Sequence, residues 1–299
     1  MTSGSNPLIE VFVLCYNRKE FVAESIRSVL AQTYQRVQLI LSDNSTTDEV
    51  SEFLRNEFPT LELRRRKPSL SNYDHLNLVL AEANAKYLMI FHDDDILEPS
   101  YIADLIAELE KNGASAGCAN ARLLIDGKKT DKLFNQTLRK NNLISNPRDL
   151  AKNYLDYSYG VNPFPGYIYR RGAIQGLRFD LKEAGQYCDV TFLVKVAQTG
   201  AIFWSARPAM FYRKHGGNVS GNISIVAMKR MIRFLVEKGI YSKTATELRL
   251  FRYWNHLFSI RNRKRRNLRS RRPQIELTLK YFTFHPVPLI RKAMQKLNF

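Results

Sequence analysis

Residues 87–95 read Tyr-Leu-Met-Ile-Phe-His-Asp-Asp-Asp, an apolar run followed almost at once by three carboxylates. The five residues from Tyr87 to Phe91 show no polar alternation, which is typical of a strand buried on both faces of a parallel sheet. The acids then lie at the C-terminal end of this strand, where open α/β sheets bind their ligands. This run predicts an α/β fold with a ligand site beside Asp93, Asp94 and Asp95.

Three neighbouring carboxylates repel one another unless a cation or strong donors neutralise them. Mg²⁺ and Mn²⁺ prefer oxygen ligands and are often completed by substrate phosphates, so the run indicates a metal that joins Asp93 and Asp95 to a diphosphate. An acidic surface turn is the alternative, because Asp95 precedes Glu98-Pro99 and could cap the next helix. The run alone does not decide between the two.

Strands and helices alternate on both sides of this run. We expect strands at 8–14, 37–41, 61–63, 87–91 and 116–119, with a helix after each of the first four. Alternation at this spacing predicts βαβ units and a mostly parallel sheet flanked by helices. Asn17 is expected to cap the first helix.

Polar residues follow three of these strands where each strand ends, and they should converge on one crevice. Asp43 could accept from a base N–H or a hydroxyl there, or only stabilise its own turn. Tyr16 could contact a ligand or pack at the rim. Neither a Gly-x-Gly-x-x-Gly motif nor a P-loop is present, so phosphates must be held in another way. The converging residues are Cys15, Tyr16, Asn17, Arg18, Asp43, Asp93, Asp94 and Asp95.

Several motifs occur in order within residues 7–221. They are Leu8–Arg18 closing with Cys-Tyr-Asn-Arg, Ser-Val-Leu-Ala-Gln-Thr-Tyr at 28–34, Leu39–Asp48, Tyr87–Pro99, Arg178-Phe179-Asp180, Tyr187-Cys188-Asp189, and Tyr212–Ser220. In order and spacing they resemble the GT-A glycosyltransferases of family 2. The resemblance implies an inverting transfer of a sugar from a nucleotide sugar, most simply a UDP-sugar, with Mn²⁺ or Mg²⁺ as cofactor.

The resemblance also implies roles for individual residues. The turn from Cys15 to Arg18 (Cys15, Tyr16, Asn17, Arg18), together with Asp43, Asp93, Asp94 and His215, would hold the nucleotide sugar. Asp93, Asp95 and His215 would hold the metal, and Asp189 would be the catalytic base. An inverting displacement needs a carboxylate opposite the leaving group to accept the acceptor's proton, while a metal neutralises the diphosphate.

Two of these roles have alternatives. The family usually has Glu-Asp where this chain has Cys188-Asp189, so acceptor binding differs here. Asp189 could be only the N-cap of a helix over 190–198, and the two roles are compatible. His215 could be a loop histidine with a purely structural hydrogen bond.

The resemblance predicts a GT-A domain over 1–221 and a basic helical extension over 222–299. Within the domain, residues 7–120 would bind the nucleotide sugar and 121–221 the acceptor. Phe164 and Tyr167 could stack on a sugar or pack in the core. The expected acceptor is a glycan or a lipid-linked hydroxyl, as in surface polysaccharide or lipopolysaccharide synthesis.

The charge is distributed unevenly along the chain. Its net value is +18, and residues 201–299 carry 22 Lys or Arg against three acids. A basic run at 263–273 and an amphipathic helix at about 288–297 are typical of a segment that lies on an anionic membrane surface. Docking on the body, or on another subunit of a homo-oligomer, is the alternative.

Three classes of function fit a basic chain of this length. A nucleic-acid-binding protein is disfavoured because the basic tail has no recognisable base-stacking module. A non-catalytic scaffold leaves the acids at three strand ends unexplained. The three cysteines are odd in number and far apart, which indicates a reducing compartment. We therefore expect a cytoplasmic glycosyltransferase that lies peripherally on the inner face of the cell membrane, with no nucleic-acid partner.

Overall fold

The computed structural model describes residues 7–155, 160–216 and 224–242. The predicted basic run and the C-terminal amphipathic helix lie outside the described residues. Contacts divide the chain into two units, the first formed by 1–154 and 158–240. The second, formed by 155–157 and 241–299, lies almost wholly outside the described residues.

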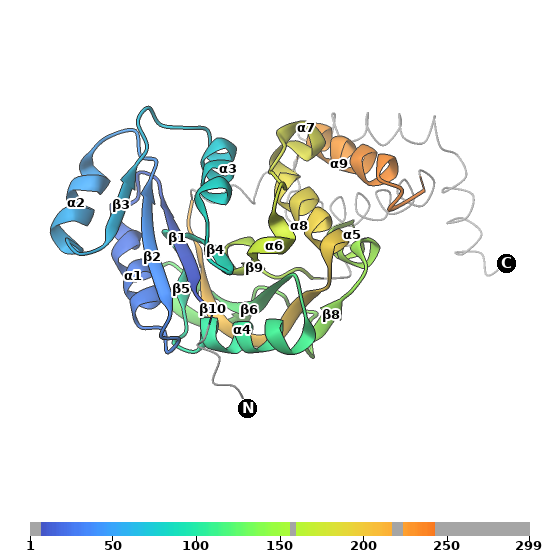
Figure 1. The fold of residues 1–299 in the computed structure, drawn as a ribbon, viewed down its shortest axis with the longest axis horizontal. Coiled ribbons are helices and arrows are strands. Elements are labelled where there is room, and N and C mark those ends of the chain that lie inside the picture. The colour runs from blue at the N-terminus through green and yellow to red at the C-terminus, as the bar shows by residue number, and fades with distance from the viewer. Residues whose placement is uncertain (1–6, 156–159, 217–223, 243–299) are drawn as a thin grey trace, which may run out of the picture. The chain divides into compact units, whose positions relative to one another are not determined.

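The first unit contains one mixed ten-stranded sheet (Figure 1). Its order is β3 (Glu62–Arg65), β2 (Val37–Asp43), β1 (Ile9–Cys15), β4 (Tyr87–His92), β9 (Ile168–Arg170), β6 (Ala116–Ile125), β10 (Ile202–Lys214) and β5 (Ile96–Leu97). In addition, β7 (Lys128–Leu133) pairs with β6, and β8 (Asn142–Ile144) pairs with β10. The strands from β3 to β4 are parallel, as expected. Beyond them β9 runs antiparallel to both β4 and β6, and β6 and β10 are again parallel.

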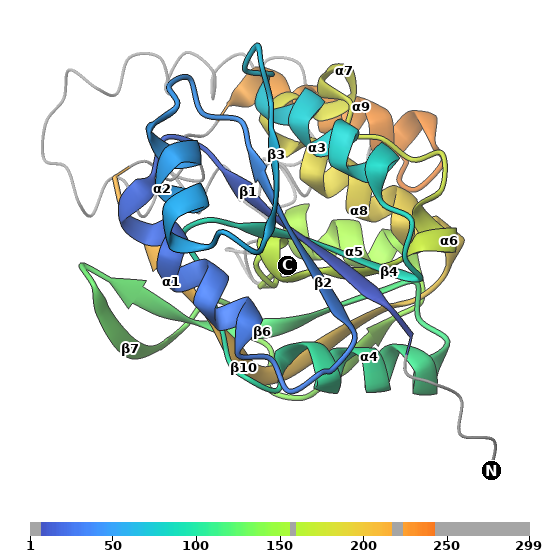
Figure 2. The same ribbon diagram turned by 60° about the vertical axis from the view of Figure 1, so that its left-hand side comes forward.

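Helices cover both faces of this sheet. Side chains of α1 (Lys19–Leu30), α2 (Glu49–Glu57) and α4 (Tyr101–Asn112) share one apolar cluster with β1, β2 and β4. The helices α3 (Asn72–Glu82) and α8 (Cys188–Thr199) lie on the other side of the strands (Figure 2). The remaining helices are α5 (Pro147–Leu155), η1 (Phe164–Gly166), α6 (Arg171–Ile174), α7 (Leu181–Ala184), η2 (Gly185–Tyr187) and α9 (Ile225–Glu237). The predicted α/β class is confirmed.

The central strands form because their apolar residues can be buried on two faces at once. All seven residues of β1 are buried; Val11 and Val13 lie in the cluster with α1, and Phe12 points to the opposite face. In α1 the spacing of Val22, Ile26 and Val29 gives one apolar stripe against this cluster. The absence of polar alternation in β1 and β4 is thus explained by helices above and below.

The register of the parallel strands brings their ends together. Cys15 at the end of β1 pairs with Asp43 at the end of β2, and Leu14 pairs with His92 at the end of β4. The three segments that follow these strands therefore start at one edge of the sheet. This is the edge at which the sequence placed the ligand site.

Some local expectations were wrong. Asn17 does not cap α1, whose N-cap is Arg18; instead Asn17 has a φ of 53° and its side chain accepts from the backbone N–H of Thr46 at 2.9 Å. Tyr167 cannot stack on a sugar, because it is fully buried and its hydroxyl accepts from the Trp204 indole at 2.7 Å. The core-packing alternative applies to Tyr167.

The first unit continues past residue 221. Helix α9 packs on α7, and the backbone at Gly185 lies against Ala227. Met228, Met231 and Leu235 of α9 are buried. The division of the chain at 221 stays a prediction. None of the described helices is long and apolar enough to cross a membrane.

Candidate active site

The three consecutive acids lie inside the protein. Asp93, Asp94 and Asp95 are 0%, 4% and 1% exposed, and α4 has Ser100 as its N-cap. A solvated surface turn that caps the next helix is therefore excluded. Carboxylates this deeply buried need cationic or N–H partners.

The hydrogen-bond partners of Asp93 and Asp95 come from two segments that are far apart in the sequence. Asp93 accepts from the backbone N–H of Tyr16 at 2.9 Å and forms an ion pair with Arg18. Asp95 accepts from the backbone N–H of Arg213 at 2.9 Å, and the Arg213 side chain donates to the Asp94 carbonyl at 2.7 Å. Segments after β1 and within β10 thus hold the acids from two sides.

Asp94 lies between two basic side chains. Its Oδ2 accepts from the Arg18 guanidinium at 2.9 Å and from His215 Nε2 at 2.7 Å. The structure therefore brings together four of the predicted site residues, Arg18, Asp93, Asp94 and His215. His215 thus has a hydrogen bond to a site carboxylate, and its role in ligand binding stays a prediction.

Burial and neighbouring charges shift the pKa values of the three acids in different directions. Burial raises the pKa of Asp93 to about 7 and that of Asp95 well above its ordinary value, and the neighbouring Asp94 adds to both shifts. Burial also acts to raise the pKa of Asp94, but His92, Arg18 and His215 outweigh it and the pKa is lowered. Asp94 is thus ionised, while the other two need a further cation to be stable as carboxylates at neutral pH.

A divalent metal fits this arrangement. His92, Asp94 and Asp95 each offer a ligand atom, and these atoms lie within 4.8 Å of one another. The Oδ2 atom of Asp95 is buried and has no hydrogen-bond partner among the described residues. Burial lowers the pKa of His92, which keeps its imidazole neutral as a metal ligand requires.

The predicted ligands were Asp93, Asp95 and His215. In the structure Asp93 faces Arg18 and Tyr16, and His215 faces Asp94, so the group with converging ligand atoms differs in two positions. The predicted ligand set stays a prediction. His92 was not anticipated, although it directly precedes the acids in the sequence.

Helix α1 fastens the segment that follows the acids. The Ser25 hydroxyl donates to the Asp95 carbonyl at 2.6 Å, and Ser28 Oγ accepts from the Leu97 backbone at 3.1 Å. One turn further, the Gln32 side chain donates to the Glu98 carbonyl at 2.8 Å and accepts from the backbone N–H of Ile102 at 3.0 Å. Ser25 therefore fixes Asp95 itself, and the motif at 28–34 fixes the residues that follow it.

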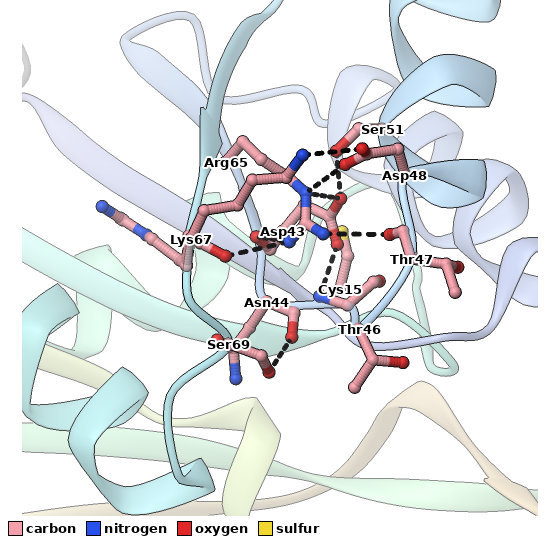
Figure 3. A network of polar contacts seen from close by, with 12 residues as sticks. Cys15, Asp43, Asn44, Thr46, Thr47, Asp48, Ser51, Arg65, Lys67 and Ser69 are labelled. Atoms are coloured by element: carbon pink, nitrogen blue, oxygen red, sulfur yellow. Dashed lines mark hydrogen bonds and ion pairs between the residues drawn. The ribbon is translucent and has the colours of Figure 1, made fainter.

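Asp43 is fully buried in a polar network of its own (Figure 3). Its carboxylate accepts from the Ser45 backbone at 2.9 Å and from the Ser51 hydroxyl, and Arg65 Nε lies 3.6 Å away. Arg65 also binds the side chain of Asp48 at 3.2 Å. Asp43 therefore does stabilise its turn, the alternative raised by the sequence, and its contact with a nucleotide stays a prediction.

The turn after β1 presents mainly its backbone and Tyr16. The Cys15 side chain is fully buried, and its carbonyl accepts from Asn44 N–H at 3.0 Å. Asn17 N–H donates to Ser45 Oγ at 2.9 Å, and the Tyr16 side chain is 48% exposed at the rim. Only the backbone atoms of Cys15 could therefore contact a ligand.

His75 in α3 supports the end of β2 and gives the site a pH-dependent stability. Arg66 donates to Ser42 Oγ at 3.0 Å, and the Ser42 hydroxyl forms a hydrogen bond with His75 Nε2 at 2.7 Å. Burial, with Arg66, lowers the pKa of His75 from 6.5 to about 4.

We expect this histidine to lower the free energy of unfolding as pH falls from 6.5 to 4, by up to about 3 kcal/mol. The unfolded chain binds a proton in this range that the native state excludes. Urea unfolding of the wild type and of His75→Gln across this range checks the expectation. The substitution should flatten the pH dependence, and equal slopes in the two proteins would contradict it.

Asp189 lies in the first turn of α8, whose N-cap is Tyr187. The N-cap alternative is therefore wrong, although a carboxylate in this turn still favours the helix. Burial raises the pKa of Asp189 to about 6, which keeps it a usable base at neutral pH.

Aromatic rings link α8 to the acid cluster. Phe164 lies 6.4 Å from His92 and 5.8 Å from Phe179, centroid to centroid, and Phe179 stacks on Phe192 of α8 at 4.1 Å. Asn77 of α3 fixes Phe179 by accepting from its N–H at 2.8 Å and donating to its carbonyl at 2.9 Å. The helix that carries Asp189 is thus packed through Phe164 and Phe179 to the end of β4.

Arg213 is a second site residue that sequence reasoning missed. It is 6% exposed, it pairs with Glu24 of α1, and its guanidinium lies 4.6 Å from the Phe21 ring centroid. The only signal was its place two residues before His215. Its partner acids are more than a hundred residues away in the chain, so spacing could not reveal them.

The comparison with known families agrees with this geometry. The glycosyl transferase family 2 model matches residues 10–178, which run from β1 past Phe164. The chain belongs to glycosyl transferase family 2. It is therefore a transferase, and the role of its Asp93–Asp95 run as a metal-binding element stays a prediction.

Relatives of this family 2 glycosyltransferase include an uncharacterized glycosyltransferase of Haemophilus influenzae. The two are 27% identical over 225 residues, which are 72% of this chain and 68% of that protein. The putative glycosyltransferase EpsE of Bacillus subtilis is 30% identical over 113 residues, 36% of this chain and 41% of EpsE.

The fold is shared with residues 1–349 of S. aureus TarS, solved in complex with UDP-GlcNAc. The TM-score is 0.62, the identity is 18%, and the match covers 89% of this chain and 78% of that one. At this identity the likeness shows the fold alone, which is the predicted GT-A fold.

Proposed function

We propose that this glycosyltransferase moves a sugar from a nucleoside diphosphate sugar, a UDP-sugar in the simplest case, to a hydroxyl of a glycan or lipid-linked acceptor. The transfer inverts the anomeric carbon and serves surface polysaccharide or lipopolysaccharide synthesis. The observation that carries the proposal is the buried cluster of Asp93, Asp94 and Asp95 with Arg18 and His215 at the ends of parallel strands. TarS, of like fold, was solved with UDP-GlcNAc and with UDP.

The donor's diphosphate is held at the acid cluster. A bound Mn²⁺ or Mg²⁺ would neutralise the charge that develops on the departing diphosphate. His92, Asp94 and Asp95 would hold the ion, with Asp93 or His215 as alternatives from the sequence. Arg18 contributes a positive charge beside Asp94, and His215 contributes a ring N–H donor to the same carboxylate. The turn at Tyr16 and Asn17, with Asp43 behind it, lines the nucleotide's base and ribose.

Asp189 accepts the proton of the attacking hydroxyl. Its raised pKa of about 6 suits a base that must be ionised at neutral pH yet be a useful proton acceptor. Residues 121–221 supply the acceptor half, with Phe164 between His92 and Phe179 as part of its floor.

A panel of nucleotide sugars tests the function. Each donor is incubated with the purified chain and Mn²⁺, and release of the nucleoside diphosphate is measured. We expect release from one donor or a few, and its loss with a chelator. A panel on which no donor is turned over, with or without metal, would contradict the proposal.

The basic extension is proposed to hold the enzyme on an anionic membrane surface. Removal of residues 263–299 takes away the run at 263–273, and each basic residue near such a surface contributes about 1 kcal/mol. We expect the truncated protein to leave vesicles that contain phosphatidylglycerol, and salt to weaken binding of the intact protein. Equal binding to neutral and anionic vesicles would favour docking on the body or in a homo-oligomer instead.

A further inference from the structure

The guanidinium of Arg18 lies among the carboxylates that a divalent ion needs. Arg18 donates to Asp94 Oδ2 at 2.9 Å with one nitrogen and pairs with Asp93 through another. Asp94 is also one of the three residues whose ligand atoms converge with His92 and Asp95. The same carboxylate thus serves two cations, the arginine and the ion.

Arg18 leaves one of its hydrogen-bond donors unsatisfied in this position. Its Nε is buried and has no hydrogen-bond partner among the described residues, and a buried donor without an acceptor is unfavourable. The side chain keeps 28% exposure, so its outer face can receive a ligand. An anionic oxygen at that exposed face would add an acceptor to the guanidinium, while the Nε–H stays buried.

Charge decides which ligand improves this arrangement. A free divalent ion at Asp94 and Asp95 would lie a few ångströms from the guanidinium, and like charges at that distance repel strongly. A diphosphate brings negative charge that offsets both cations, and arginine forms well-matched paired hydrogen bonds with phosphate oxygens.

We propose that Arg18 makes the site selective for the ion together with a diphosphate, by competing with the free ion for Asp94 and by binding phosphate oxygens once both ligands are present. This inference rests on the proposed function, since it takes the diphosphate to be that of the donor. It names Arg18 as the residue that couples the two ligands. By linkage, the diphosphate must raise the affinity for the ion by the same factor as the ion raises that for the diphosphate.

The test compares Arg18→Gln with Lys19→Gln. Lys19 is the next residue and carries the same charge, but it pairs with Glu49 at 3.3 Å and is about half exposed. Binding of Mn²⁺ alone is followed by the electron paramagnetic resonance signal of free Mn²⁺, and binding of UDP by calorimetry with and without Mn²⁺. We expect Arg18→Gln to bind Mn²⁺ alone about tenfold more tightly, because the repulsion is gone.

UDP in the presence of Mn²⁺ should bind to Arg18→Gln at least about tenfold more weakly than to the wild type. The coupling between UDP and Mn²⁺, roughly 5–150-fold for typical linked sites, should shrink accordingly. Lys19→Gln should match the wild type in all three quantities. Arg18→Lys provides a second variant: it should still exclude free Mn²⁺, because the charge remains, but bind UDP more weakly because the paired geometry is lost.

The outcomes separate this inference from the function on which it rests. An affinity for Mn²⁺ alone that Arg18→Gln leaves unchanged or weakens overturns the competition, whatever the donor is. Unchanged coupling in Arg18→Gln overturns the role in diphosphate binding. A wild type that binds no UDP with Mn²⁺ and turns over no nucleotide sugar overturns the proposed function itself. Near-ultraviolet circular dichroism and thermal unfolding show that each variant compared is folded.

Discussion

Replacement of Asp189 by Asn is expected to lower turnover by roughly 10²–10⁴-fold while leaving donor affinity nearly unchanged. The amide has nearly the shape of the carboxylate but cannot accept the acceptor's proton. Asp189 Oδ1 accepts from the Val190 N–H at 2.9 Å, and the amide oxygen of Asn can keep that contact. Steady-state rates and UDP affinity measured on the same preparations distinguish loss of the base from loss of the donor site.

The pH dependence of the rate provides a second test of Asp189 as the base. Burial raises the pKa of Asp189 to about 6, and a base acts only when it is ionised. The rate in the wild type should therefore fall as pH drops through about 6 and level off above it. The residual rate of Asp189→Asn should lack this limb, since its side chain does not titrate.

Glu183 provides the matched control, because it is the next acid that could serve as base. In the structure its carboxylate forms an ion pair with Lys195 at 2.8 Å. We expect Glu183→Gln to retain most of the turnover. A nearly normal Asp189→Asn together with an impaired Glu183→Gln would move the role of base to Glu183.

The position of the acid cluster could be predicted from sequence because few physical conditions determine it. A run without polar alternation must be buried on both faces, and parallel strands that start together also end together. The pairing of Cys15 with Asp43 and of Leu14 with His92 follows from these conditions. The convergence of these strand ends could therefore be predicted without knowledge of the side-chain contacts.

The partners of the acids could not be predicted in the same way. Arg213 reaches Asp94 and Asp95 from more than a hundred residues away, because β10 returns to the sheet beside β6 and places its end next to β5. The insertion of β9 between β4 and β6 also escaped the alternation rule, since its three residues give no periodic signal. Long-range contacts of this kind depend on the order of strands, which spacing does not encode.

Asp43 shows a different limit of sequence reasoning. Its position at a strand end was right, but the sequence could not show that Ser51 and Arg65 already satisfy its carboxylate. Both lie downstream of the turn, on α2 and β3, and only the fold brings them to Asp43. A carboxylate chosen as a ligand-binding candidate for its place at a strand end can therefore already be paired with residues of the protein itself.

Asp95→Ala is expected to abolish the Mn²⁺-dependent binding of UDP, because Asp95 Oδ2 is the one buried carboxylate oxygen without a partner among the described residues. Burial and the neighbouring Asp94 raise the pKa of Asp95 well above its ordinary value, so its ionised form is unfavourable without a cation. Removing the carboxylate should thus not unfold the metal-free protein. The free energy of unfolding, measured with urea in the presence of a chelator, should fall by no more than the about 1–3 kcal/mol that the orphaned Arg213 N–H costs.

Asp95→Asn refines this prediction, since alanine also removes the acceptor of the Arg213 N–H, a loss of about 1–3 kcal/mol for a buried donor. Asparagine keeps an oxygen for that N–H but supplies no negative charge to an ion. Both variants should lose the Mn²⁺-dependent part of UDP binding, while only Asp95→Ala loses stability. If both variants bind UDP with Mn²⁺ as tightly as the wild type, the ion is held by other residues, and Asp93 and His215 become the first to substitute.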